Sequence, residues 1–162
     1  MVVVDSSALI PLARVGELGL VMDTFDTVRT IAPVEEEVLE EGKPGTAHLS
    51  SFLEEVAVEE LPDKAEVVAE LEGIAVAGAG VVLLAEDRSE GLVANEKALM
   101  EVARAHGVES WWVTTLLLHC TKSGIVSSGE ASEILYGLVD ERMNLSPSVY
   151  TQVQNKLDKI GG

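Results

Sequence analysis

The stretch MVVVDSSALI, residues 1–10, places three consecutive valines directly before an aspartate and two serines. β-branched residues without polar alternation are typical of a strand buried on both faces of a parallel sheet, so Val2–Val4 predict a short central strand. Ser6 or Ser7 can cap the helix that follows. Asp5 is a carboxylate at the end of a buried strand, where it either caps a helix or holds a metal ion. The stretch alone leaves both roles open.

The rest of the chain alternates strand and helix patterns. Further strands are predicted at residues 27–32, 56–61, 91–94 and 110–114. Helices are predicted from Ser6 towards Leu18, from Pro33 to a stop at Gly42, over 50–55, over 63–85 in two pieces, over 95–106, through Leu118 and Cys120, over 130–142, and after Ser146 as N-cap with Pro147 in the first turn. Such alternation predicts an α/β fold with a mainly parallel sheet. With no repeat and no long linker, residues 1–162 are expected to form a single domain.

The composition limits the classes of function. The chain has 11 Lys and Arg against 28 Asp and Glu, a formal net charge of −17. Such a surface repels polyanions, which argues against a large basic groove for nucleic acid, although a protein adapted to a high-salt cytosol would have screened charges. Cys120 is the single cysteine, so no internal disulfide is expected. With no long apolar run and no recognisable leader, we expect no membrane span and a cytoplasmic protein.

Oxygen-bearing side chains follow several of the predicted strands. Asp5 follows the first, the run Glu35–Glu37 the second, Asn95-Glu96 the fourth and Thr114-Thr115 the fifth. In an open parallel sheet the chemistry collects at the carboxyl ends of the strands. Hard divalent cations such as Mg²⁺ prefer oxygen ligands, and they activate water and offset charge on a phosphoryl centre. The sequence therefore predicts a divalent-metal site at this edge.

Five motifs together resemble the PIN-domain nucleases, in particular an archaeal, toxin-like branch of that family. They are MVVVDSSALIPLARVGEL (1–18), APVEEEVLEEG (32–42), GLVANEKALMEVARAHGVE (91–109), WWVTTLLLHCTKSGIV (111–126) and NLSPSVYTQVQNKL (144–157). The resemblance implies a three-layer α/β/α sandwich around a parallel sheet of about five strands. It also implies an endoribonuclease that depends on Mg²⁺ or Mn²⁺, an antitoxin protein as partner, and a homodimer.

The resemblance also assigns roles to residues of this chain. Asp5 matches the first metal carboxylate, Glu37 the second with Glu36 as the alternative register, and Glu96 the acidic residue after the fourth strand. Ser6 matches the hydroxyl beside the first aspartate, and Thr114 or Thr115 is the accessory polar group.

One position departs from the family pattern. The family normally has a further carboxylate where its fourth helix begins, and the matching segment here, AVAGAGVVLLAEDR (75–88), has Gly78 at that place. A glycine has no side chain to hold a metal, so we expect weakened metal binding and reduced or altered cleavage. Small residues in such a helix also allow close packing on the sheet. The alternative function is therefore a catalytically degenerate PIN-like module that binds or assembles. A haloacid-dehalogenase-type phosphatase is disfavoured because Ser7 stands where that family needs a second aspartate.

Overall fold

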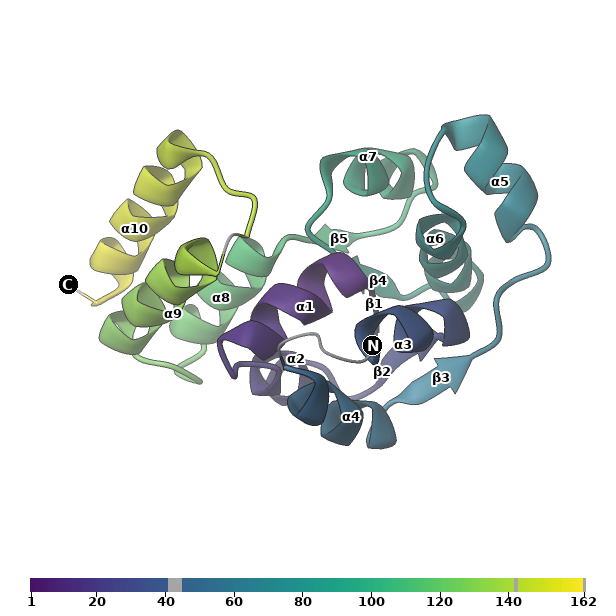
Figure 1. The fold of residues 1–162 in the computed structure, drawn as a ribbon. Helices are drawn as coiled ribbons and strands as arrows, with labels where there is room; N and C mark the ends of the chain where they lie inside the picture. Colours follow the sequence, from purple (N-terminus) through teal and green to yellow (C-terminus); the bar gives the residue numbers. More distant parts are fainter. Residues whose placement is uncertain (41–44, 142, 162) are drawn as a thin grey trace.

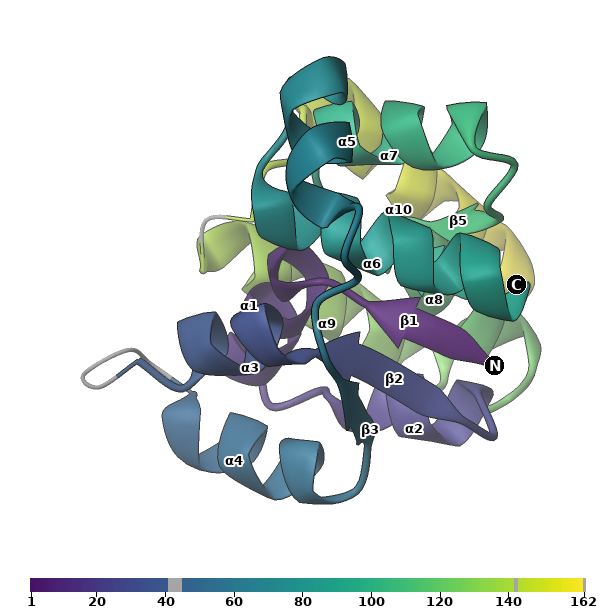
Figure 2. The same ribbon diagram turned by 90° about the vertical axis from the view of Figure 1, so that its right-hand side faces the viewer.

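The valine strand lies at the centre of a five-stranded, all-parallel sheet. The computed structural model describes residues 1–40, 45–141 and 143–161. The strand order is β3-β2-β1-β4-β5 (Figure 1, Figure 2). The strands are β1 Val2–Val4, β2 Val28–Ile31, β3 Ala57–Glu59, β4 Gly91–Val93 and β5 Ser110–Trp111. This confirms the predicted parallel sheet and its five strands.

The register explains why β1 has no polar residue. Val2 pairs with Val28 of β2 on one side, and Val4 pairs with Val93 of β4 on the other. All three valines of β1 are 0% exposed, because helices cover both faces of the sheet. Val93 pairs in turn with Trp111, so Val4, Val93 and Trp111 lie level across three neighbouring strands.

Helices form a layer on each face of the sheet, which confirms the three-layer arrangement (Figure 1). One face carries α5 Ala65–Glu72, α6 Val76–Arg88 and α7 Lys97–Ala105. The other carries α1 Ser6–Arg14, α2 Gly19–Thr24, α3 Ala32–Val38, α4 Thr46–Glu54, α8 Val113–Lys122 and α9 Ser128–Asp140. The last helix, α10 Pro147–Gly161, packs on α8 and α9 at the side of the molecule rather than on the sheet.

Some helix boundaries differ from the prediction. α4 begins at Thr46, four residues before the expected start, and its N-cap Gly45 has φ 82° and no capping side chain, so no polar capping signal marks this start. α9 begins at Ser128 because Ser127 and Glu130 form a capping box. The predicted stop at Gly42 and the predicted end of the ninth helix at Arg142 lie outside the described residues. The predicted cap of α10 is confirmed, since Ser146 Oγ accepts from Val149 N at 3.2 Å.

The small residues of α6 allow this helix to lie close to the sheet. A Cβ on Gly80 would be 2.7 Å from Ile31 Cδ1 and from Leu61 Cδ1, so a larger residue here would require the ends of these side chains to move. Gly80 therefore allows α6 to pack closely on Ile31 of β2, as the segment's composition predicted.

Among the described helices, none alone is long and apolar enough to cross a membrane. α5 and α6 meet the criteria only as a pair, by length and composition, and they are bent by 112° relative to each other.

A charged network crosses the sheet outside the apolar core. Arg29 of β2 donates to Glu90 at 3.0 Å and to Glu59 at 3.2 Å, and Arg88 donates to the same Glu59 oxygen at 3.1 Å. The Glu90 side chain is only 3% exposed, and its Oε2 has no hydrogen-bond partner among the described residues. Arg29 is thus the partner on which the buried Glu90 charge depends.

We expect Arg29→Met to lower the free energy of unfolding by about 3 kcal/mol, because it leaves a buried carboxylate without its cation. Arg88→Met is the matched control. It removes a half-exposed pair with Glu59 and should cost less than about 1 kcal/mol. Urea denaturation of both variants measures the difference. Equal losses in the two variants would contradict a special role for the Arg29–Glu90 pair.

Candidate functional site

Asp5 ends the central strand and begins the first helix. Its backbone N–H donates to Val93 O at 3.0 Å and continues the sheet, while its carbonyl accepts from Ala8 and Leu9. Its side chain accepts from Ser7 N at 3.1 Å, so Asp5 is the N-cap of α1. The prediction that Ser6 or Ser7 caps this helix is therefore wrong. Aspartate and serine are both good caps, and Asp5 is the residue that directly precedes the first helical residue.

Ser7 joins the ends of two neighbouring strands. Its hydroxyl donates to Asp5 Oδ2 at 2.6 Å and accepts from Asn95 N at 2.8 Å. Asn95 follows β4, so the bridge spans 88 residues of sequence and orients the Asp5 carboxylate relative to the β4–α7 connection. The sequence pointed to Ser7 only as a capping candidate, because nothing local to SSAL indicates a partner so far along the chain.

The environment of Asp5 opposes its ionised form. The residue is 4% exposed, and burial raises the pKa of its carboxyl above the ordinary value of 3.8. Hydrogen bonds from Ser7 oppose this rise, whereas the negative charge of Glu37 adds to it. A cation bound beside the Asp5 carboxylate would offset both of these effects and stabilise its ionised form.

Two of the three predicted carboxylates, Glu37 and Glu96, line one cavity of about 290 Å³ at the carboxyl edge of the sheet. Ser6 lines it from α1, Glu37 from α3, and Asn95 and Glu96 from the connection into α7. Glu96 is the exposed N-cap residue of α7 and makes no side-chain cap there. The buried Asp5 is not itself part of the lining, but its carboxylate accepts a hydrogen bond from Ser7, which is.

The remaining predicted site residues lie elsewhere. Glu36 is exposed on α3 and does not line the cavity, so the structure places Glu37 rather than Glu36 beside Asp5. Thr114 is buried in the first turn of α8, and it is not part of the lining. Thr115 is exposed and lines a different cavity, between α8 and α10.

The donor atoms suit a hard, partly hydrated cation. In the described part of the chain, no three His, Cys, Asp or Glu side chains are grouped closely enough to enclose a metal ion. Mg²⁺ commonly binds through one or two carboxylates and keeps several waters, which substrate phosphates replace. Asp5 and Glu37, with the hydroxyl and amide oxygens of Ser6 and Asn95, fit that kind of site. Glu96 lies at the same cavity without completing a group of three.

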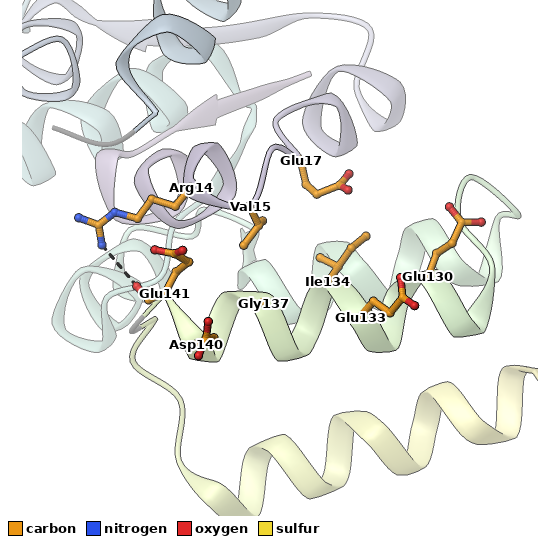
Figure 3. Close-up of a pocket in the computed structure, with 9 residues that line it drawn as sticks. All are labelled: Arg14, Val15, Glu17, Glu130, Glu133, Ile134, Gly137, Asp140 and Glu141. Carbon is orange, nitrogen blue, oxygen red and sulfur yellow. Dashed lines mark hydrogen bonds between the residues drawn. The ribbon is translucent and has the colours of Figure 1, made fainter.

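An acidic groove adjoins this cavity and shares Arg14 and Glu141 with it. Figure 3 shows the groove between the end of α1 and the face of α9. Its acidic side chains are Glu17, Glu130, Glu133, Asp140 and Glu141. Burial and the charge of Glu130 raise the pKa of Glu17. Arg14 is the one basic side chain in the lining, and it donates to Glu141 O at 3.4 Å. A polyanion therefore meets repulsion on this side of the candidate site.

The comparisons with known proteins agree with this architecture. The family model that matches residues 1–159 is described as a PIN domain. A search of curated proteins gives no match. Among solved structures, the chain is similar to that of PAE2754 from Pyrobaculum aerophilum, with a TM-score of 0.57 and 24% sequence identity. That similarity covers 73% of this chain and 94% of the other, and it bears on the fold alone.

We expect Asp5→Asn to be more stable than the wild type at pH 7 in the absence of metal. Asparagine keeps an acceptor for Ser7 and removes the buried charge. Because the folded-state pKa of Asp5 is raised, its favourable contribution is complete below pH 3.8 and is lost as pH rises through the higher folded value. Asp5→Asn should therefore be more stable than the wild type near neutrality, and this advantage should shrink on acidification. Urea titrations in EDTA at several pH values measure it. A gap between the two proteins that does not change with pH would contradict this account.

Proposed function

The chain belongs to the PIN-domain family, and we propose that it is a metal-dependent endoribonuclease that cleaves RNA phosphodiester bonds. The observation that carries the proposal is the buried Asp5 carboxylate. It stands at the end of the central strand, fixed by Ser7, and the negative charge of Glu37 acts against its ionised form. A buried carboxylate held against a second one lowers stability, and such perturbed groups cluster where function requires them.

Each residue of the candidate site has its own chemical role in this proposal. Asp5 and Glu37 would hold Mg²⁺ or Mn²⁺, which supplies an activated water and offsets charge on the phosphoryl group when bound. Ser7 fixes the Asp5 carboxylate through its 2.6 Å hydrogen bond. Glu96 is exposed at the rim, where its carboxylate can accept a proton from a water molecule or orient it. An antitoxin protein and a homodimer stay predictions of the resemblance.

A second candidate function, a PIN-like binding or assembly module without cleavage, is favoured by Gly78. This residue is buried near the start of α6, and a Cβ on it would lie 3.2 Å from Leu99 Cδ1 and 3.9 Å from Ile74 Cδ1. The position faces apolar side chains of the core rather than the cavity. A site with fewer carboxylates holds metal less tightly, and a module of this kind would bind its partners without needing one.

Incubation of the protein with labelled RNA and Mn²⁺ or Mg²⁺, at low and at high salt, tests the nuclease proposal. We expect cleavage that EDTA abolishes and that Asp5→Asn reduces by about 100-fold or more, beyond the loss caused by altering an outer-shell partner of a metal ligand. Glu36→Gln is the control, because it removes one acidic charge from α3, the helix that carries Glu37, at a position outside the cavity, and it should keep activity. Cleavage that is equal in the wild type and Asp5→Asn would refute the proposal.

The variant Gly78→Asp separates the two candidate functions further. Because its carboxylate would enter the contact with Leu99, we expect a loss of about 2 kcal/mol or more in unfolding free energy and no tighter Mn²⁺ binding. Gly78→Ala controls for the added Cβ and should change stability by about 1 kcal/mol or less. Denaturation and calorimetric Mn²⁺ titration measure both. Tighter metal binding or stronger cleavage by Gly78→Asp would instead show that the chain lacks only this ligand.

A further inference from the structure

A threonine occupies a fully buried position in the second strand of the sheet. Thr30 of β2 is 0% exposed, and its hydroxyl donates to Val4 O at 2.8 Å. A buried hydroxyl without a partner costs free energy, so threonine requires such a bond at this position. Valine has the same branched shape, is equally suited to a strand and needs no partner. The hydrogen bond, rather than the volume of the side chain, is therefore what threonine adds here.

This bond holds the peptide group that leads into Asp5. The carbonyl of Val4 and the N–H of Asp5 belong to one planar peptide unit. The carbonyl accepts from Thr30 of β2, while the N–H donates to Val93 O of β4 at 3.0 Å. β2 and β4 are the two neighbours of β1 in the sheet. The last peptide unit before Asp5 is thus held from both sides, which fixes its orientation at the point where the strand ends.

The same bond joins the starting points of two helices. Val4 directly precedes Asp5, which is the N-cap of α1. Thr30 directly precedes Ile31, which is the N-cap of α3. The parallel strands β1 and β2 lie side by side and lead into these two helices (Figure 2). One proposed metal ligand, Asp5, stands at the start of α1, and the other, Glu37, lies on α3. The bond therefore ties together the two chain segments that carry the proposed ligands.

The hydroxyl of Ser7 holds Asp5 in a different way. It donates to the Asp5 carboxylate and accepts from Asn95 N, which follows β4. Ser7 lies on α1, so it fixes the Asp5 side chain but does not fix α1 relative to α3. Functional side chains must be held within about 0.5 Å of their working geometry by supporting hydrogen bonds. For a pair of carboxylates on two helices, this requires a bond between the helix starts as well as one to the side chain.

We propose that Thr30 is a positioning residue of the candidate metal site. Its hydroxyl fixes the peptide group before Asp5 against the start of α3, and so sets how the carboxylates of Asp5 and Glu37 lie relative to each other. The inference rests on the proposed function for the view that these two carboxylates share a metal ion. Thr30 is buried and does not line the cavity, so it acts through Val4 and touches neither metal nor substrate.

Calorimetric titration of three variants with Mn²⁺ tests the proposal. Thr30→Val removes the hydroxyl and keeps the branched shape, and we expect it to weaken Mn²⁺ binding by about 10-fold, as the loss of an outer-shell partner of a metal ligand does. Thr30→Ser keeps the hydroxyl and should bind Mn²⁺ as the wild type does. Thr121→Val is the matched control, because it removes another buried hydroxyl, which donates to Leu117 O at 2.8 Å within α8. It should leave the Mn²⁺ affinity unchanged.

A second readout uses the metal-free protein in EDTA and does not depend on the proposed function. Amide hydrogen exchange is followed at the N–H of Asp5, which donates to Val93 O. The reference is the N–H of Leu92, which donates to Glu109 O at 2.8 Å on the other side of β4. A general loss of stability speeds exchange equally at sites that open together. We expect Thr30→Val to speed exchange at Asp5 more than at Leu92, and Thr30→Ser to behave as the wild type.

The outcomes distinguish a failure of this proposal from a failure of the proposed function. Mn²⁺ binding that Thr30→Val and Thr121→Val weaken equally would overturn the positioning role. A Thr30→Ser variant that binds Mn²⁺ as weakly as Thr30→Val would overturn it as well. If the wild type binds no Mn²⁺, the proposed function fails and the exchange rates decide alone. Equal acceleration at Asp5 and Leu92 then overturns the positioning role, whereas selective acceleration at Asp5 supports it.

Discussion

The position of Asp5 is the constraint on which the rest of the site depends. One residue continues the central strand through its N–H, starts α1 through its carbonyl and caps the same helix with its carboxylate. Burial of that carboxylate raises its pKa and costs stability. Neighbouring elements hold this carboxylate in place: Ser7 of α1 donates to it, and Asn95, in the connection after β4, donates to Ser7. Capping and metal binding are compatible uses of one carboxylate, so the two roles left open by the sequence do not exclude each other.

Acidic and basic side chains gather on different sides of the molecule. Acidic side chains line the groove beside the carboxylate cavity (Figure 3), while Lys122 of α8 and Lys156 and Lys159 of α10 line a separate cavity next to β5. A net charge of −17 argues against a broad nucleic-acid surface. It is compatible with a narrow one, because Coulomb interactions at physiological salt extend only about 8 Å.

The fold could be predicted from the sequence because the patterns that indicate strands and helices lie within short stretches of the chain. The Val2–Val4 run and the alternation of strand and helix patterns predicted the parallel sheet, and Pro147 after Ser146 predicted the start of α10. The start of α4 was missed because its N-cap is a left-handed glycine without a capping side chain. Asp5 rather than Ser6 or Ser7 caps α1, a distinction that capping preferences do not make.

The candidate site was predictable only in part because its geometry is long-range. Strand ends pointed to Asp5 and the Glu35–Glu37 run, and the family resemblance selected Glu37. The Ser7–Asn95 and Thr30–Val4 hydrogen bonds join residues far apart in sequence. Gly78 was interpreted from the sequence as a metal-ligand position that had lost its carboxylate. In the structure it lies against Leu99 in the apolar core.

The most direct test of the central claim is a crystal structure of the protein soaked in Mn²⁺, with anomalous scattering recorded at the manganese edge. We predict an anomalous peak at the carboxyl edge of the sheet, bonded to the carboxylates of Asp5 and Glu37, and its loss in Asp5→Asn. A saturating soak with no peak at Asp5, or a peak that persists unchanged in Asp5→Asn, would contradict the account.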